Sequence, residues 1–149
     1  MELEGLDEAA LEDLAAEVAS SLAPGEVVVL AGEVGAGKTT FVRAAARALG
    51  VRERVTSPTY QIARGYEGVA KERPVAVNHL DLYRLEGLEA SDALEIDDYL
   101  DPHSITFVEW AESALGLVDD PTVVRISHQT LATRRVSITG PVAERLWGC

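Results

Sequence analysis

The residues most able to do chemistry form a glycine-rich loop directly after a short apolar run. Residues 32–39 read G-x-x-x-x-G-K-T, and residues 27–31 before them are Val, Val, Val, Leu and Ala. A strand followed by this loop is typical of a P-loop, in which backbone N–H groups surround a phosphate. In such a loop Lys38 reaches the β- and γ-phosphates and the Thr39 hydroxyl ligates Mg²⁺. The sequence therefore predicts a site for a nucleoside triphosphate.

The predicted phosphate contacts come from the loop and from the first turn of a helix expected over 39–49. Glycines let the backbone approach an anion closely, and the positive end of the helix dipole faces the same point. The predicted nucleotide-binding residues are Val34, Gly35, Ala36, Gly37, Lys38, Thr39 and Thr40. Arg134 is a further candidate for a phosphate or adenine contact, the alternative being a solvated strand end.

Two carboxylates directly follow predicted buried strands. Asp81 follows the strand expected over 75–80, and Glu109 follows the strand expected over 105–108. Ligands of open α/β sheets bind beyond the carboxyl ends of the strands, so both side chains should lie beside Thr39. Mg²⁺ prefers hydroxyl and carboxylate oxygens, which these three residues supply. We predict that one carboxylate holds the ion and the other orients the attacking water, with the two roles unassigned. The alternative for each is a salt bridge at a strand end.

Two more polar residues lie near this expected site. Thr59, in Ser-Pro-Thr-Tyr at 57–60, sits where P-loop proteins often place a residue that responds to the γ-phosphate. The alternative is an ordinary Ser-Pro turn. His79 should share a strand face with Asp81, as either a core histidine or a functional one. Residues 78–81 read N-H-L-D and not the guanine-reading N-K-x-D, which favours ATP over GTP.

The elements that must position these residues follow from hydrophobic periodicity. Helices are expected over 7–22, 39–49, 86–98 and 141–147, and strands over 27–31, 59–64, 75–80, 105–108, 123–128 and 135–139. Residues 65–73 are polar and turn-rich, which indicates a hairpin loop. Alternation of strands and helices predicts an α/β P-loop NTPase-like fold: one domain, 1–149, with a mainly parallel sheet and an antiparallel C-terminal hairpin.

Composition and charge restrict the class of protein. The 149 residues are 47% hydrophobic, and no apolar run is long enough to span a membrane. Residue 149 is the one cysteine, so we expect no internal disulfide, no cysteine zinc cluster and a cytoplasmic location. The net charge of −12 should repel a nucleic-acid backbone. Residues 1–24 and 86–101 each hold seven acids and no base, either as solvated helix faces or as docking surfaces for a basic partner.

Four motifs together resemble the TsaE family, the small bacterial ATPases needed to form threonylcarbamoyladenosine on tRNA. They are G-E-V-G-A-G-K-T-T-F at 32–41, S-P-T-Y at 57–60, H-L-D-L-Y-R at 79–84 and V-E-W at 108–110. The resemblance implies ATP or ADP bound with Mg²⁺, and metal ligation by Thr39 and Glu109. Asp81 matches a Walker B-like aspartate and Thr59 a switch threonine. It also implies weak ATPase activity with TsaB and TsaD as partners, and contact with tRNA only through them.

Two other functions remain open from the sequence. A stand-alone small-molecule P-loop kinase would need an acceptor pocket and usually a basic lid, and no arginine-rich segment follows residue 86. A non-catalytic nucleotide-binding adaptor would bind ATP, but added partner proteins would not raise its rate of hydrolysis. The chain departs from the family pattern near residues 9–11, which lack a threonine, and at 132–135, which lack a glycine.

Overall fold

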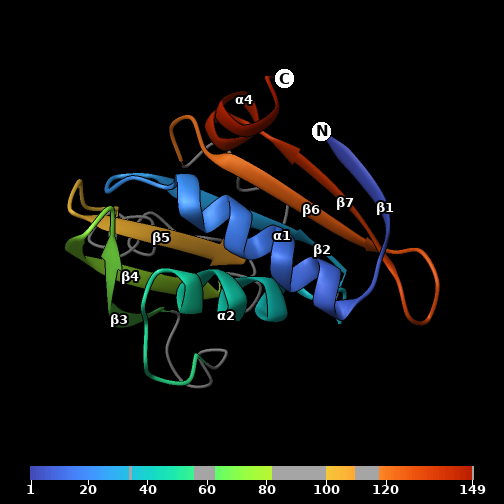
Figure 1. Ribbon diagram of the computed structural model, residues 1–149, viewed down its shortest axis with the longest axis horizontal. Helices are drawn as coiled ribbons and strands as arrows, with labels where there is room; N and C mark the ends of the chain where they lie inside the picture. Colours follow the sequence, from blue (N-terminus) through green and yellow to red (C-terminus); the bar gives the residue numbers. More distant parts are fainter. Residues whose placement is uncertain (34, 56–62, 82–99, 110–117, 149) are drawn as a thin grey trace, which may run out of the picture.

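The described strands of this protein form one mixed sheet. The computed structural model describes residues 1–33, 35–55, 63–81, 100–109 and 118–148. The strands are β1 (Glu2–Leu6), β2 (Val27–Gly32), β3 (Ala63–Ala70), β4 (Arg73–Asp81), β5 (Ser104–Glu109), β6 (Thr122–His128) and β7 (Arg134–Thr139). The described helices are α1 (Glu8–Ser21), α2 (Lys38–Ala48) and α4 (Pro141–Trp147). Figure 1 shows α1 and α2 side by side across one face of the sheet.

The seven strands lie in the order β1-β7-β6-β2-β5-β4-β3. The four central strands, β6, β2, β5 and β4, are mutually parallel. Antiparallel strands extend the sheet on both sides, with β7 and β1 beyond β6 and with β3 beyond β4. This arrangement confirms the predicted α/β class, the parallel central sheet and the antiparallel C-terminal hairpin. It places the carboxyl ends of β2, β4 and β5 at one edge.

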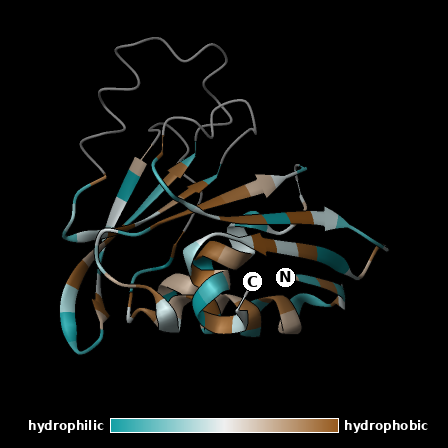
Figure 2. Ribbon diagram, turned by 90° about the horizontal axis from the view of Figure 1, so that it is seen from above, coloured by the Kyte–Doolittle hydropathy of each residue, from teal (hydrophilic) through white to brown (hydrophobic). Residues whose placement is uncertain are grey.

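Buried apolar side chains pack on both faces of the sheet. On the helical face, Leu14 and Val18 of α1 and Phe41 of α2 are buried against inward-facing strand residues such as Val28 and Phe107. On the other face a smaller buried cluster consists of Val29, Ala63, Leu80, Val108, Val118 and Val123. Figure 2 shows the hydrophobic colouring concentrated along the strands, with the helices gathered on one side. None of the described helices is long and apolar enough to cross a bilayer.

The prediction of a hairpin loop over 65–73 is wrong in its extent. Most of this stretch belongs to β3, and the turn itself is confined to Lys71 and Glu72, which both have positive φ. Gly68 favours a turn in the sequence because glycine weakens strands. In the fold, however, it permits a close approach: a Cβ on Gly68 would lie 2.6 Å from the carbonyl oxygen of Leu49. The adjacent Val69 N–H donates to the same oxygen at 2.5 Å. β3 is therefore tethered to the end of α2.

The other expected elements agree with the structure wherever it describes them. The helices expected over 7–22, 39–49 and 141–147 are confirmed to within one residue at each end, and the strands starting at 27, 75, 105, 123 and 135 are confirmed to within two. The sequence pattern does not predict strand β1. The helix expected over 86–98, and residues 59–62 of the strand expected over 59–64, lie outside the described residues.

Gly32, at the end of β2, allows the closest backbone approach in the loop region. Its φ is 147°, and an added Cβ would lie 2.1 Å from the carbonyl oxygen of Ile126 on β6. We expect Gly32→Ala to lower the free energy of unfolding by about 3–5 kcal/mol, because steric overlap adds to backbone strain. Gly35→Ala is the control, since a Cβ there meets nothing within 4 Å and only the positive φ is strained. Urea denaturation of both variants checks this, and equal losses would contradict it.

Candidate nucleotide and metal site

The predicted P-loop joins the end of β2 to the start of α2. Gly37 has a left-handed φ of 114° and forms the N-cap of α2, and as a glycine it offers no side chain to accept a hydrogen bond from the first turn. The N–H groups of an uncapped helix N-terminus and the helix dipole both favour an anion. Gly35 also has positive φ, and a Cβ added to it would meet nothing within 4 Å, so the loop is open on that side. This geometry suits a phosphate group.

Lys38 lies over this loop and is only 7% exposed. Its Nζ donates to the carbonyl oxygens of Gly32 at 2.8 Å and Glu33 at 2.7 Å. Burial lowers the pKa of Lys38, while the carboxylates of Glu109, Asp81 and Glu33 raise it and so offset part of that effect. The lysine is thus held at the loop, and both predicted metal-binding carboxylates are close enough to act on its charge.

Thr39, Asp81 and Glu109 converge as predicted. The Thr39 hydroxyl donates to the Glu109 carboxylate, with distances of 3.2 Å to Oε1 and 3.4 Å to Oε2. Asp81 and Glu109 are register partners at the ends of the parallel strands β4 and β5, so their side chains leave the same face at the same edge. Glu109 is 4% exposed. One hydroxyl and two carboxylates therefore surround the end of the P-loop.

The donor set fits Mg²⁺ bound together with phosphate better than a protein-only metal site. No group of three or more His, Cys, Asp and Glu side chains able to hold a metal occurs among the residues that the structure describes. Mg²⁺ commonly takes one or two protein carboxylates and completes its octahedron with waters and phosphate oxygens. Thr39, Asp81 and Glu109 have this composition, and they lie beside the loop that suits the phosphates.

His79 is a component of the site whose role the sequence leaves undecided. Its Nε2 lies 2.5 Å from Oε2 of Glu109, and the side chain is 1% exposed. The other ring nitrogen, Nδ1, is buried without a hydrogen-bond partner in the described part of the chain. An unpaired buried N–H is costlier than an unpaired lone pair, which favours the tautomer with its proton on Nε2. His79 then donates to Glu109 and fixes the direction of that carboxylate.

Loss of this donor should destabilise the protein measurably. We expect His79→Ala to lower the free energy of unfolding by about 1–3 kcal/mol, because a buried carboxylate oxygen loses its nearer donor and keeps only the longer contact with Thr39. His79→Gln should lose less, since the amide N–H₂ can donate to the same oxygen. Exposed His128 provides the control as His128→Ala, with no significant change. Chemical denaturation measures all three, and equal losses for the alanine and glutamine variants at 79 would contradict the assigned hydrogen bond.

Arg134, predicted as a phosphate or adenine contact, lies against the P-loop. Its Nε donates to the carbonyl oxygen of Ala36 at 2.9 Å. A terminal nitrogen of the same guanidinium donates to Thr133 O at 3.1 Å. The residue is therefore placed at the loop from the β6–β7 hairpin, where it positions loop backbone. This contact could not be predicted from the sequence, because Arg134 and Ala36 are 98 residues apart.

Two of the predicted residues, Val34 and Thr59, lie outside the described part of the chain, so their proposed contacts stay predictions. Thr40 lies in the first turn of α2, next to Thr39. Leu11 of α1, which was not predicted, also reaches the loop: a Cβ on Gly37 would lie 2.9 Å from its Cδ2. Helical spacing places Leu11 on a helix, but gives no sign that it covers the P-loop.

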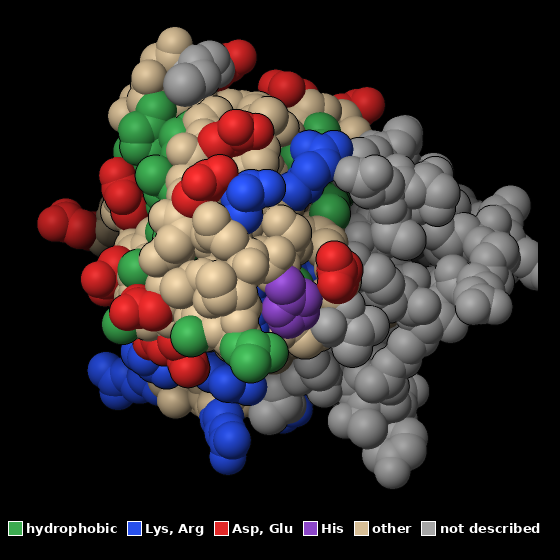
Figure 3. Space-filling model, turned by 90° about the vertical axis from the view of Figure 1, so that its right-hand side faces the viewer, with side chains coloured by type: hydrophobic (Ala, Val, Ile, Leu, Met, Phe, Trp, Pro, Cys, Tyr) green, Lys and Arg blue, Asp and Glu red, His purple; other side chains and the backbone are tan. Residues whose placement is uncertain are grey.

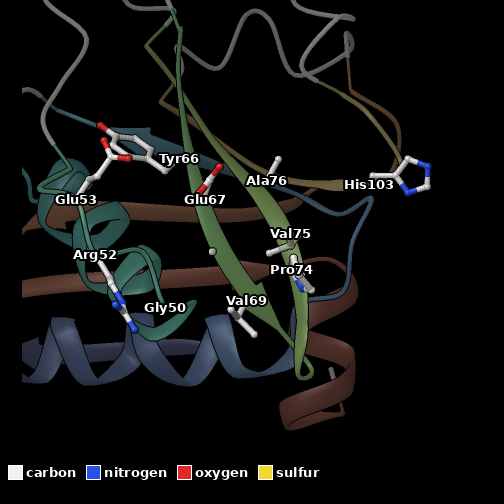
Figure 4. A pocket seen from close by; sticks show the side chains of 11 residues that line it. Gly50, Arg52, Glu53, Tyr66, Glu67, Val69, Pro74, Val75, Ala76 and His103 are labelled. Carbon is white, nitrogen blue, oxygen red and sulfur yellow. The ribbon is translucent and has the colours of Figure 1, made fainter.

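A surface hollow of about 780 Å³ lies away from this site. Figure 4 shows its lining side chains around the β3–β4 hairpin, among them Tyr66, Val69 and Pro74, with His103 at the far side. Pro74 is the second residue of β4 and His103 precedes β5, so the hollow is at the amino ends of those strands. The P-loop is at their opposite ends. The hollow therefore does not belong to the predicted nucleotide site.

Comparisons with known proteins agree with the fold and the motifs. The family model described as "Threonylcarbamoyl adenosine biosynthesis protein TsaE" matches residues 6–136. A TsaE protein of Streptomyces coelicolor is 38% identical over 136 residues, covering 87% of this chain and 90% of the relative. One of Treponema pallidum is 35% identical, covering 79% and 83%. The crystal structure of Bacillus subtilis YdiB matches with a TM-score of 0.72 at 25% identity, covering 97% of this chain and 87% of YdiB.

Proposed function

Because the chain belongs to the TsaE family of threonylcarbamoyladenosine biosynthesis proteins, we propose that it is the Mg²⁺-dependent ATPase of that tRNA modification. One observation carries the proposal. Lys38, Thr39, Asp81 and Glu109 come from three separate segments and meet at one sheet edge, beside a helix N-terminus whose N-cap is the glycine Gly37. ATP or ADP with Mg²⁺ is the ligand whose charges and oxygen ligands match this set.

Each residue has a distinct role in the proposed reaction. Mg²⁺ bound with ATP supplies charge neutralisation on the β- and γ-phosphates. Lys38 contributes a second positive charge to the phosphates, aided by the N–H groups of α2. Thr39 and Glu109, which are hydrogen-bonded to each other, would hold the metal. Asp81 would then orient the attacking water and accept its proton, with Glu109 as the metal ligand and Asp81 as the base.

We propose TsaD and TsaB as partners, because the family resemblance implies them. The family acts in tRNA modification, whereas the site described above suits the hydrolysis of ATP. Hydrolysis would then serve the partner complex, with a slow rate in isolation. Acidic residues 1–24 include the solvent-exposed side of α1, where Glu8, Asp13 and Glu17 are exposed. A basic surface on a protein partner would complement this helix.

Calorimetry and phosphate release test the proposal together. ATP and ADP should bind at about one equivalent, more tightly with Mg²⁺ than with EDTA, and TsaB with TsaD should raise the hydrolysis rate. Absence of nucleotide binding would overturn the whole proposal. Binding with hydrolysis that never responds to the partners would favour an adaptor role. Stoichiometric phosphate transfer to a small acceptor would favour a kinase.

A further inference from the structure

The two oxygens of the Glu109 carboxylate have different surroundings. Oε2 lies 2.5 Å from His79 Nε2, and both side chains of this contact are buried. Oε1 lies 3.2 Å from the Thr39 hydroxyl, which is 3.4 Å from Oε2. The buried histidine therefore engages one oxygen closely, and the other oxygen is the nearer one to the P-loop threonine.

Packing alone does not explain a histidine at position 79. The side chain is 1% exposed, and its Nδ1 has no hydrogen-bond partner in the described part of the chain. Strand alternation places His79 on the same face of β4 as Val75 and Val77, which belong to the apolar core. An apolar side chain would fill this place without burying an unpaired polar atom. What the imidazole adds is its contact with Glu109.

The charge of the protein cannot decide which divalent ion binds at the site. The net charge is −12, and Figure 3 shows acidic side chains in several places over one side of the described surface. Such a field attracts Mg²⁺ and Ca²⁺ alike, because both ions carry the same charge. A preference between them has to come from the number and the arrangement of the ligand oxygens.

We propose that His79 makes the site selective for Mg²⁺ over Ca²⁺, by holding Oε2 of Glu109 and leaving Oε1 as the single oxygen for the ion. Mg²⁺ requires a near-ideal octahedron at about 2.0–2.1 Å, whereas Ca²⁺ takes about six to eight oxygens and accepts both oxygens of one carboxylate. A hydrogen bond from outside the ligand shell fixes the direction of a carboxylate and so restricts it to one mode of binding. This inference rests on the proposed function, because it takes Glu109 as a ligand of the ion that binds with the nucleotide.

Two amide variants separate the hydrogen bond from the rest of the side chain. The amide nitrogen of His79→Gln comes close to the position of Nε2 and can donate to Oε2. The shorter side chain of His79→Asn ends near the position of Nδ1, so Oε2 loses this donor. The two variants are otherwise alike in charge and polarity, and they form a matched pair.

Binding of a fluorescent methylanthraniloyl-ADP to the full chain, followed while Mg²⁺ or Ca²⁺ is added, tests the proposal. In wild type, Mg²⁺ should give its half-maximal effect at a lower concentration than Ca²⁺. His79→Asn should raise the Mg²⁺ value about 10- to 100-fold, as for other lost partners of metal ligands. Its Ca²⁺ value should change less than about threefold, because Ca²⁺ can use the released oxygen. His79→Gln should keep both values within about threefold of wild type.

Three controls accompany this measurement. His103→Asn exchanges an exposed histidine that precedes β5, at the opposite ends of the strands, and should leave both values unchanged. Binding of the labelled ADP in EDTA should be the same in all variants, because the proposed effect needs the ion. Circular dichroism checks the fold of each variant. If His79→Asn does not fold, His79→Leu, which has a similar volume and no donor, takes its place with the same expectations.

The outcomes separate this inference from the proposed function. Equal rises for Mg²⁺ and Ca²⁺ in His79→Asn, or an unchanged Mg²⁺ value, would overturn the role of His79 in selecting the ion. The same loss in His79→Gln, or equal responses of wild type to the two ions, would also overturn it. In each of these cases the proposed ATPase still stands, because wild type binds ADP with Mg²⁺. Absence of ADP binding by wild type would instead defeat the proposed function, and the role of His79 with it.

Discussion

Replacing Lys38 with alanine is expected to raise the Kd for ATP about 10- to 150-fold. This range corresponds to the loss of one charge-assisted contact worth about 1.5–3 kcal/mol. The structure supports the direction, because Lys38 Nζ is held within hydrogen-bond distance of the loop carbonyls of Gly32 and Glu33, where a phosphate bound in the loop would meet it. Isothermal titration calorimetry with ATP and Mg²⁺ measures the change.

Lys71→Ala is the matched control for that measurement. It removes the same side chain from an exposed turn between β3 and β4, and so changes the net charge equally. Its Kd for ATP should stay within about twofold of wild type, because surface charges at this distance are screened. A Lys38→Ala variant that remains folded and binds ATP as tightly as Lys71→Ala would show that the loop does not hold the phosphates.

Replacing Glu109 with glutamine should separate binding from turnover. Glutamine keeps one side-chain oxygen, which in the position of Oε2 still accepts from His79 and from Thr39, the latter at 3.4 Å, but it removes the negative charge offered to Mg²⁺. We expect the Kd for ATP to change less than about fivefold while the hydrolysis rate with TsaB and TsaD falls at least about 100-fold, as for other lost catalytic groups. Phosphate release and calorimetry on the same protein give both numbers.

The control for this variant is Glu67→Gln on β3, an exposed carboxylate far from the P-loop. It should leave both the Kd and the hydrolysis rate unchanged. Normal hydrolysis by Glu109→Gln would assign the metal to Asp81, its register partner on β4. Asp81→Asn, tested in parallel, would then carry the full loss of rate.

The site is predictable from sequence as far as local patterns and strand order allow. The P-loop is contiguous, so its residues specify their own geometry. Asp81 and Glu109 are identifiable because both follow buried apolar runs, and the carboxyl ends of parallel strands share an edge. The contact between Arg134 and Ala36 depends on how the β6–β7 hairpin lies over the loop, which no local pattern encodes.

The differences in the fold have equally physical causes. β1 is short and its burial pattern shows four exposed residues before Leu6, so it has no alternation to detect. It exists because β7 offers it an edge. Gly68 favours a turn by its residue type, although its missing side chain makes room for Leu49 O. The fold thus overrides weak local preferences where two distant segments meet, and glycine alone does not distinguish a turn from a close approach.

The short strand β1 has a consequence for the handling of this protein. It pairs with β7 through Glu2 and Leu3, and the Ile138 N–H of β7 donates to Met1 O at 2.9 Å. Deletion of residues 1–6 would expose the backbone N–H and C=O groups of β7 that now pair with β1. These groups could then pair with a strand of another molecule. Such truncated material should aggregate on concentration. Purification tags are therefore better attached beyond α4 than in place of these residues.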